Sequence, residues 1–211
     1  TDQALLERLG RIKNVVLLEP SPKIYTEVSV NGVLVAGFND PRFFGDSNTN
    51  NNQKQEPAAE AFNLAYADRP RPDIVVSHEP AAVKLVKSAT LLINGHMHSD
   101  ELDGNRIGVG TFTGGGTVSH FLVDKQAPAV SSGDQLGELE GQPYAFDVAQ
   151  FSQTCDLASL TRYTFRNLID GRPAYDDVSV INGKTIATRE TGARSCATDL
   201  GVSQTTVTLG G

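Results

Sequence analysis

The chain has 211 residues, of which 39% are hydrophobic, enough for the buried core of one large domain or of a domain with an appendage. Its 18 basic and 25 acidic residues give a formal charge of -7, and no run of Lys or Arg supplies the positive surface that binding to a nucleic-acid backbone needs. No apolar stretch approaches the roughly 20 residues that span a bilayer, and the first residues lack the order of a signal peptide. These properties argue against nucleic acid as a bulk partner and against a membrane-spanning segment in this sequence.

The first part of the chain predicts a helix followed by strands. Asp2 can cap a helix whose apolar residues recur at helical spacing as far as Ile12. Three strands are then predicted, at residues 14–19, 24–30 and 33–37. Asn31-Gly32 is typical of the two-residue turn of a tight hairpin between the last two strands. Residues 38–55 are polar and lack periodicity, which indicates a long surface loop.

The middle of the chain predicts a compact β-α-β unit preceded by a helix. Pro57 at a first helical position, with alanines and a phenylalanine on one face, predicts a helix over 57–67. The apolar runs 74–77 and 91–93 read as strands, and Pro80 begins a short helix between them. Strands joined in this way lie parallel.

Three of the four histidines follow these two strands. His78 ends the first, and His96 and His98 stand in the glycine turn after the second. Because both strands end at the same edge of the sheet, where open α/β sheets bind ligands, the three rings can converge. Imidazole is the commonest metal-ligating side chain, so the three are candidate metal ligands. Each alone also fits a histidine that merely hydrogen-bonds a loop, and His120, which alternates within an expected strand, is interpreted as structural.

The second half of the chain is expected to be mainly β. A hairpin is predicted around Asp103-Gly104-Asn105, and further strands at residues 117–124, 144–151, 157–165 and 175–181. Gly114-Gly115-Gly116 fits either a close backbone approach to a ligand or a flexible connector. Residues from 183 onward show weak periodicity. The expected organisation is a first unit over 1–124, a linker or extended crossing over 125–141, and a β-rich region over 142–211 packed on the same domain.

The two cysteines, Cys155 and Cys196, match no zinc-ligand spacing. They fit either the disulfide of an exported protein or two ordinary thiols. An extracytoplasmic location is compatible with the first interpretation, and a cytoplasmic one with the second.

Two motifs resemble the calcineurin-like metallophosphoesterases. That family closes its site with a histidine after a short apolar strand and then, after a β-α-β step, with a Gly-His-x-His turn; here these are Val75-Val76-Ser77-His78 and Gly95-His96-Met97-His98. Similarity extends to the Asp-Pro step at Asp40-Pro41 and to the turn at 110–115. The resemblance covers roughly residues 1–165. It implies an α/β (α+β) fold: part of a metallophosphoesterase-like β-sandwich with flanking helices and a β-rich C-terminal region.

The opening motifs of that family, Asp-x-His, Gly-Asp and Gly-Asn-His-Asp, do not stand in their expected places. Asp46 follows Gly45 and Asp40 follows Asn39, but both occur too late, and we interpret them as unrelated to those motifs. The expectation is that the chain is the C-terminal part of a longer protein, and that alone it is a poor catalyst or none.

By resemblance, the intact protein would hydrolyse small phosphate mono- or diesters with two divalent metal ions (Mn, Fe or Zn), of which this chain alone would bind one or none. His78 and His96 would bind one ion and His98 the other. Glu79 and Asp100 could orient the rings as hydrogen-bond acceptors. Two alternatives stay open: a non-catalytic scaffold of the same fold, and a mononuclear zinc site formed by the three histidines. The sequence leaves the substrate and the oligomeric state undetermined.

Overall fold

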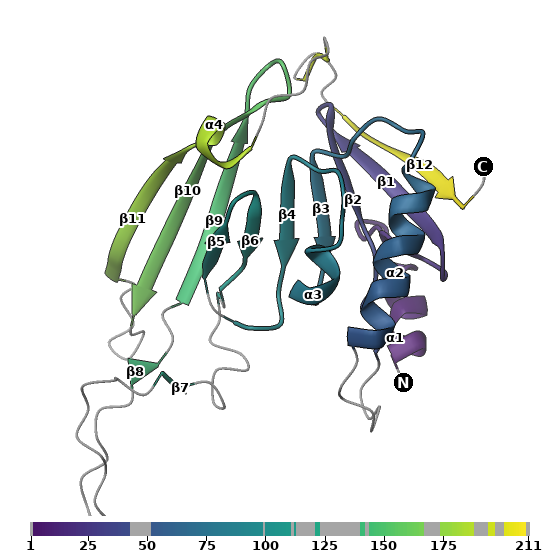
Figure 1. Ribbon diagram of the computed structural model, residues 1–211, viewed down its shortest axis with the longest axis horizontal. Coiled ribbons are helices and arrows are strands. Elements are labelled where there is room, and N and C mark those ends of the chain that lie inside the picture. Colours follow the sequence, from purple (N-terminus) through teal and green to yellow (C-terminus); the bar gives the residue numbers. More distant parts are fainter. Residues whose placement is uncertain are drawn as a thin grey trace, which may run out of the picture.

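A computed structural model of the chain shows an α/β fold with a seven-stranded mixed sheet, a three-stranded antiparallel sheet and few helices (Figure 1). The structure describes residues 2–42, 52–98, 100–110, 112, 121–122, 140–141, 144–166, 174–187, 194–196 and 201–209. In that part of the chain, no helix is both long and apolar enough to cross a membrane.

The seven-stranded sheet has a parallel centre and antiparallel edges. Its strands, in spatial order, are β12 (Val202–Thr208), β1 (Ile24–Val30), β2 (Val33–Gly37), β3 (Ile74–Ser77), β4 (Leu91–Asn94), β6 (Arg106–Gly108) and β5 (Glu101–Asp103). Strands β2, β3, β4 and β6 run parallel, while β12 and β5 pair antiparallel at the two edges. The predicted β-α-β unit with parallel strands is therefore confirmed, and all the central strands end at one edge of the sheet.

Both predicted hairpins are present. Val30 pairs with Val33 across Asn31 and Gly32, whose φ values of 51° and 87° are those that a tight two-residue turn requires. Asp103 pairs with Arg106 across a turn in which Gly104 has a φ of 58°. Local turn chemistry therefore set the register of these strands.

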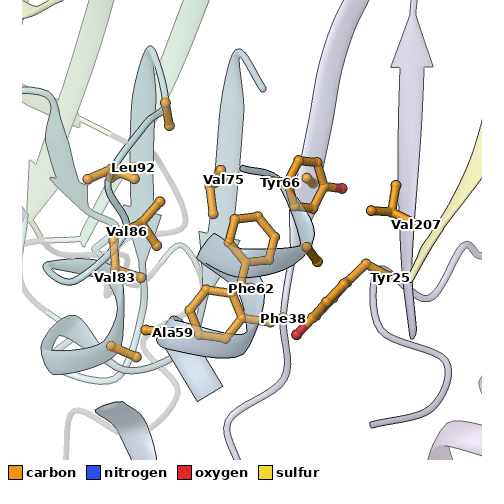
Figure 2. Packing of buried hydrophobic residues seen from close by; sticks show 14 residues of the cluster. Tyr25, Phe38, Ala59, Phe62, Tyr66, Val75, Val83, Val86, Leu92 and Val207 are labelled. Carbon is orange, nitrogen blue, oxygen red and sulfur yellow. The ribbon is translucent and has the colours of Figure 1, made fainter. Parts of the chain in front are cut away.

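Helices cover one face of this sheet. α2 (Asn52–Ala65) and α3 (Pro80–Val83) pack there, and α1 (Asp2–Leu9) lies beside α2 (Figure 1). The core beneath them joins Phe62 of α2 and Tyr66 just after it, whose rings stack with centroids 4.5 Å apart, to Tyr25 of β1 and Val75 of β3 (Figure 2). Leu92 of β4 also belongs to this core. Side chains of successive strand residues point to opposite faces, so the preceding Leu91 faces the other way.

The opposite face carries the second sheet at the β5 and β6 end (Figure 1). This sheet contains β9 (Tyr144–Phe151), β10 (Leu157–Arg166) and β11 (Ala174–Asn182), and is followed by α4 (Gly183–Ile186). A second core joins Leu91 and Ile107 of the large sheet to Leu157 and Leu160 of β10. The short strands β7 (Phe121–Leu122) and β8 (Glu140–Gly141) pair with each other.

Three sequence predictions were wrong or incomplete. Residues 14–19 form no strand, although the Leu18 carbonyl accepts a hydrogen bond from the Thr26 amide. The second helix starts at Asn52, not at Pro57, so residues 52–55 are helical where a loop was expected. The region after residue 183 contains β12, which pairs along the whole of β1. The triple glycine at 114–116, most of 117–124 and most of 125–141 lie outside the described residues.

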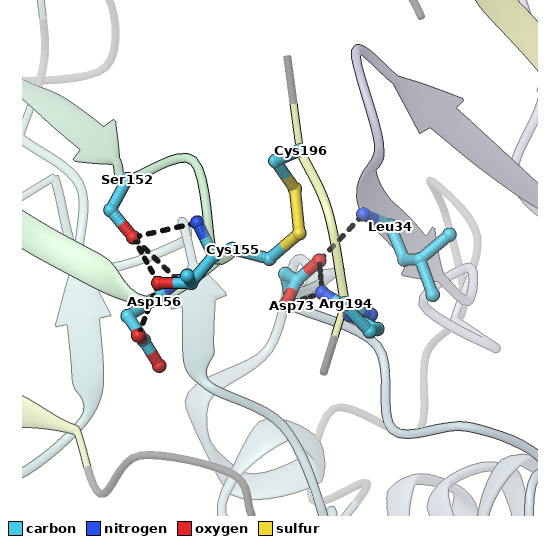
Figure 3. The surroundings of a disulfide bond; sticks show 8 residues. Leu34, Asp73, Ser152, Cys155, Asp156, Arg194 and Cys196 are labelled. Carbon is cyan, nitrogen blue, oxygen red and sulfur yellow. Dashed lines mark hydrogen bonds and ion pairs between the residues drawn. A yellow bond between two sulfur atoms is a disulfide. The ribbon is translucent and has the colours of Figure 1, made fainter. Parts of the chain in front are cut away.

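Cys155 and Cys196 form a disulfide, with their Cα atoms 5.1 Å apart (Figure 3). It joins the turn between β9 and β10 to the segment 194–196. In the same segment, Arg194 forms an ion pair with the buried Asp73, which also accepts a hydrogen bond from the Leu34 amide at 2.8 Å. The segment therefore ties the second sheet to the start of β3, and leads to β12 at the far edge of the large sheet.

Candidate functional site

The candidate site lies at the edge where the parallel strands end. Asp40 follows β2, His78 and Glu79 follow β3, and His96 follows β4. Neighbouring strands pair in register, with Gly37 opposite Val76 and Ser77 opposite Asn94. Residues that come directly after these strands are thus brought to one rim by the backbone alone.

His78 and His96 meet at this rim. The Nε2 atom of His78 lies 3.2 Å from the Nδ1 atom of His96, and the two rings are nearly perpendicular, with an interplanar angle of 81°. Two nitrogen ligands about 2.1 Å from a shared metal ion lie roughly 3.0 Å apart at an octahedral angle and roughly 3.4 Å apart at a tetrahedral one. The observed separation falls between these values, and it is also that of a hydrogen bond between the two rings. The distance is thus compatible with two ligands of one ion.

The backbone holds the turn in a strained form. His96 and His98 have φ values of 67° and 55°, in the left-handed region that residues other than glycine seldom adopt. The Gly95 amide donates to the His78 carbonyl at 3.1 Å, and a Cβ on Gly95 would lie 3.3 Å from the Nδ1 atom of His78. The glycine therefore allows the His78 ring to pack directly against the turn.

Hydrogen bonds of buried polar residues hold the turn in place. Asn94, which is 1% exposed, donates from its side chain to the Gly95 carbonyl at 3.1 Å. Its Oδ1 atom accepts a hydrogen bond of 3.0 Å from Arg106, a buried arginine that also pairs with Glu101 and Asp103. This chain of contacts fixes the backbone from which His96 projects.

Two carboxylates and an arginine lie beside the histidines. The Glu79 carboxylate is 3.7 Å from the Nε2 atom of His96 and also contacts Arg42. Arg42 binds Asp40 through two of its nitrogens, with Nε to Oδ1 at 2.9 Å, and Gln55 donates to Asp40 at 2.8 Å. Asp40 and Glu79 are therefore joined through one guanidinium group.

This environment sets the charge of the groups. Burial, and secondarily the charge of His96, lower the pKa of the His78 ring, which favours the neutral imidazole that can ligate a metal. Burial raises the pKa of the Asp40 carboxyl, but hydrogen bonds from Arg42 and Gln55 outweigh burial and leave that pKa below its usual value. The site thus combines a neutral His78 with an ionised, arginine-bound carboxylate.

The structure brings together two of the three histidines that the sequence singled out. His98 is half-buried in the same turn, but among the described residues no group of three or more His, Cys, Asp or Glu side chains is placed to hold a metal ion. Glu79 lies near His96, but at 3.7 Å it is beyond hydrogen-bond distance, and none of the described contacts joins Asp100 to either ring. His120 lies outside the described residues.

Sequence reasoning missed the part played by Asp40 and Arg42. Asp40 was set aside because it does not stand within the expected motif, and Arg42 was not singled out. The signal was available, because both follow a strand predicted to precede the β-α-β unit. If β2 pairs with β3, its carboxyl end must lie next to His78.

Comparison of the chain with protein-family models, with curated proteins and with solved structures finds no match. The functional assignment therefore rests on the residues of the site.

Proposed function

We propose that this chain provides the histidine side of the metal centre of a phosphoesterase. The observation that supports the proposal most directly is the 3.2 Å separation of His78 Nε2 and His96 Nδ1 at the carboxyl edge of two parallel strands. The donor chemistry also fits, because neutral imidazole is a common ligand of Zn²⁺, Mn²⁺ and Fe ions. The proposal also goes beyond the observed α/β architecture, because it takes the chain to be part of a metallophosphoesterase-like β-sandwich.

In this proposal each described residue has a defined task. His78 and His96 hold one ion, and His98 contributes to a second. With Nδ1 of His96 directed at the metal, its ring proton sits on Nε2, and the charge of the Glu79 carboxylate, 3.7 Å away and beyond hydrogen-bond distance, favours this tautomer. When bound, the ions supply a hydroxide nucleophile at neutral pH and a positive clamp on the phosphoryl oxygens.

A site with two metal ions also needs a carboxylate that bridges them. None of the contacts described here supplies it. Among the described residues, the carboxylates placed beside the histidines are those of Asp40 and Glu79, and both are held by Arg42. Three imidazoles without an anionic ligand cannot offset the charge of two dications. We therefore propose that a further stretch of polypeptide, beyond these 211 residues, completes the ligand set in the intact protein.

The first test is titration of this chain with zinc and with manganese, followed by calorimetry. The second is a hydrolysis assay of the full-length protein with p-nitrophenyl phosphate. His96→Ala should abolish measurable metal binding by the chain and lower hydrolysis at least about 100-fold, because second-shell changes alone cost 10- to 100-fold. Hydrolysis at the unmutated rate would refute the role of His96. One tightly bound zinc per chain that also needs His98 would favour the mononuclear site, and full-length protein that neither binds metal nor hydrolyses the ester would favour the scaffold.

A further inference from the structure

Arg162 of β10 links the second sheet to the edge strand of the large sheet. Its side chain is buried and lies two residues beyond Leu160, on the side of β10 that faces the large sheet. The guanidinium group binds the Asp147 carboxylate of β9, through Nε at 2.8 Å and through Nη2 at 3.1 Å. Nη2 also donates to the Glu101 carbonyl of β5 at 2.9 Å. A charged donor from the second sheet therefore holds the backbone of β5.

The side chain of the same Glu101 contacts a second buried arginine. Its Oε2 atom lies 3.0 Å from Nη1 of Arg106, and this nitrogen also donates to Oδ1 of Asn94 at 3.0 Å. Because Oδ1 of Asn94 faces Arg106, its Nδ2 atom faces Gly95 and donates to that carbonyl at 3.1 Å. Contacts thus run without a gap from Arg162 through Glu101, Arg106 and Asn94 to Gly95, and we call this series the arginine relay.

The relay ends on the peptide group that sets the conformation of His96. The Gly95 carbonyl belongs to the peptide unit that joins Gly95 to His96, so a rotation of this unit changes the φ of His96. Two donors fix the direction of the carbonyl: the Asn94 side chain, and the Met97 amide at 2.8 Å. A three-residue turn of this kind with a positive φ, here 67°, is strained and persists only where its surroundings hold it.

Burial leaves the members of the relay little freedom to rearrange. An arginine does not lose its charge by deprotonation, and a buried charge without a partner is strongly destabilising. Arg106 and Arg162 must therefore keep their partners. A displacement of β10 would consequently move Glu101 and, through Arg106, the Asn94 amide.

We propose that Arg162 is a positioning residue for the histidine pair: through the arginine relay, the second sheet holds the turn in which His96 meets His78. The effect on metal affinity rests on the proposed function, whereas the effect on the distance between the two rings does not. Loss of Arg162 should loosen the contact between the rings in the metal-free chain and weaken metal binding.

The test replaces the ion pair by apolar residues of similar size, in the double variant Arg162→Met with Asp147→Leu. This replacement leaves neither charge of the pair without its partner, so the chain is expected to fold. In EDTA, the nuclear Overhauser effect between the His78 and His96 rings, whose centroids are 5.1 Å apart, should be measured first. It should weaken at least about 1.5-fold, because it falls with the sixth power of distance and a loosened site moves by about 0.5 Å or more.

Zinc affinity, measured by calorimetry, should fall about tenfold in the same variant, at the lower end of the effect of groups that orient metal ligands. The control removes another ion pair, with Arg69→Met and Glu27→Leu, since neither residue contacts a member of the relay in the described part of the chain. It should leave the ring contact and the zinc affinity unchanged. An unchanged ring contact and unchanged zinc affinity in the relay variant would overturn the proposal.

A double-mutant cycle with Asn94→Ala tests the route, because this substitution removes the last link of the relay. If Arg162 acts through Asn94, adding the ion-pair replacement to Asn94→Ala should weaken zinc binding by less than about twofold. A merely structural role would give the same loss in both backgrounds and would refute the proposal.

Arg162→Lys takes the place of the double variant if that variant does not fold. Lysine keeps the charge beside Asp147 but lacks the planar group that also reaches Glu101, so the same outcomes are expected. If the unmutated chain binds no zinc, the phosphoesterase proposal fails. The ring contact in the metal-free chain then decides whether Arg162 is a positioning residue.

Discussion

At the scale of single residues, Gly95 determines how closely the His78 ring can approach the turn that carries His96. A Cβ at position 95 would lie 3.3 Å from the His78 Nδ1 atom, closer than ordinary van der Waals contact. The ring would have to move by a few tenths of an ångström, which would change its position relative to His96. The requirement for glycine at this position is thus a matter of space for a side chain, not of backbone conformation.

We therefore predict that Gly95→Ala weakens zinc binding about tenfold, because a metal site depends on ligand positions held to about 0.5 Å. The free energy of unfolding without metal should change by less than about 1 kcal/mol. Zinc titration and urea unfolding measure the two effects. Gly201→Ala is the control, since its Cβ would meet no atom within 4 Å. Unchanged zinc affinity in Gly95→Ala would show that the His78 ring position is unimportant for binding.

Asp40 should make the stability of the folded chain depend on pH in the acid range. Its pKa is lower in the folded chain than its ordinary value near 3.9, because the hydrogen bonds of Arg42 and Gln55 outweigh burial. A carboxyl group whose pKa is lower in the folded chain than in the unfolded chain contributes its full stabilisation at pH values above its unfolded pKa. That contribution is lost as the pH falls through its folded pKa. Its loss should thus begin below about pH 4.

Asp40→Asn should lower the free energy of unfolding at pH 7 by about 1 to 3 kcal/mol, because Arg42 loses a charged acceptor. The difference from the unmutated chain should shrink below about pH 4. Urea unfolding between pH 7 and pH 2 measures it. The exposed Asp68→Asn is the control and should change little at any pH. A difference that stays constant down to pH 2 would contradict this account.

At the scale of elements, β12 is placed by pairing with β1, a strand from the other end of the sequence. Its residues are exposed except for Val207, which is 2% exposed and belongs to the core under α2. Val207 sits opposite Tyr25 of β1, so one side chain connects this edge strand to the aromatic cluster (Figure 2).

Val207→Ala should therefore destabilise the chain by about 1 to 3 kcal/mol, the usual cost of shortening a buried aliphatic side chain. Val202→Ala, in the same strand but 65% exposed, should stay within about 0.5 kcal/mol of the unmutated chain. Denaturant unfolding with far-UV circular dichroism compares them. Equal effects would mean that β12 is not anchored through Val207.

The elements that could be predicted are those whose signals are local. Asn31-Gly32 and Gly104 specify hairpins through backbone conformation, and the apolar runs at β3 and β4 specify strands through burial on both faces. β12 escaped prediction because its sequence carries one buried residue, and its pairing with β1 spans most of the chain. The position of Asp40 escaped for a related reason, since it depends on which strand β2 pairs with and not on the residues around it.

At the scale of the whole molecule, the segment 194–196 connects parts that are far apart in the sequence. Cys196 is bonded to Cys155 of the second sheet, and its amide donates to the Gln153 carbonyl at 2.8 Å. Two residues earlier, Arg194 pairs with Asp73 at the start of β3 (Figure 3). The same segment packs on Gly32, where a Cβ would lie 3.0 Å from the Cys196 backbone. This short stretch thus adds a covalent bond and an ion pair to the hydrophobic core that Leu91 and Ile107 share with Leu157 and Leu160.

The disulfide should accordingly stabilise the fold as well as restrict the unfolded chain. It closes a loop with a sequence separation of 41 residues, for which chain entropy predicts a contribution of up to about 4 kcal/mol. Replacing both cysteines by alanine should lower the free energy of unfolding by about 2 to 4 kcal/mol, and dithiothreitol should have a similar effect on the unmutated chain. Hydrogen exchange should also become faster in β12 and β1, because the segment that leads to β12 loses its anchor. A reduced chain with unchanged stability and unchanged exchange in β12 would show that the Arg194–Asp73 pair and strand pairing hold the sheets together without the covalent bond.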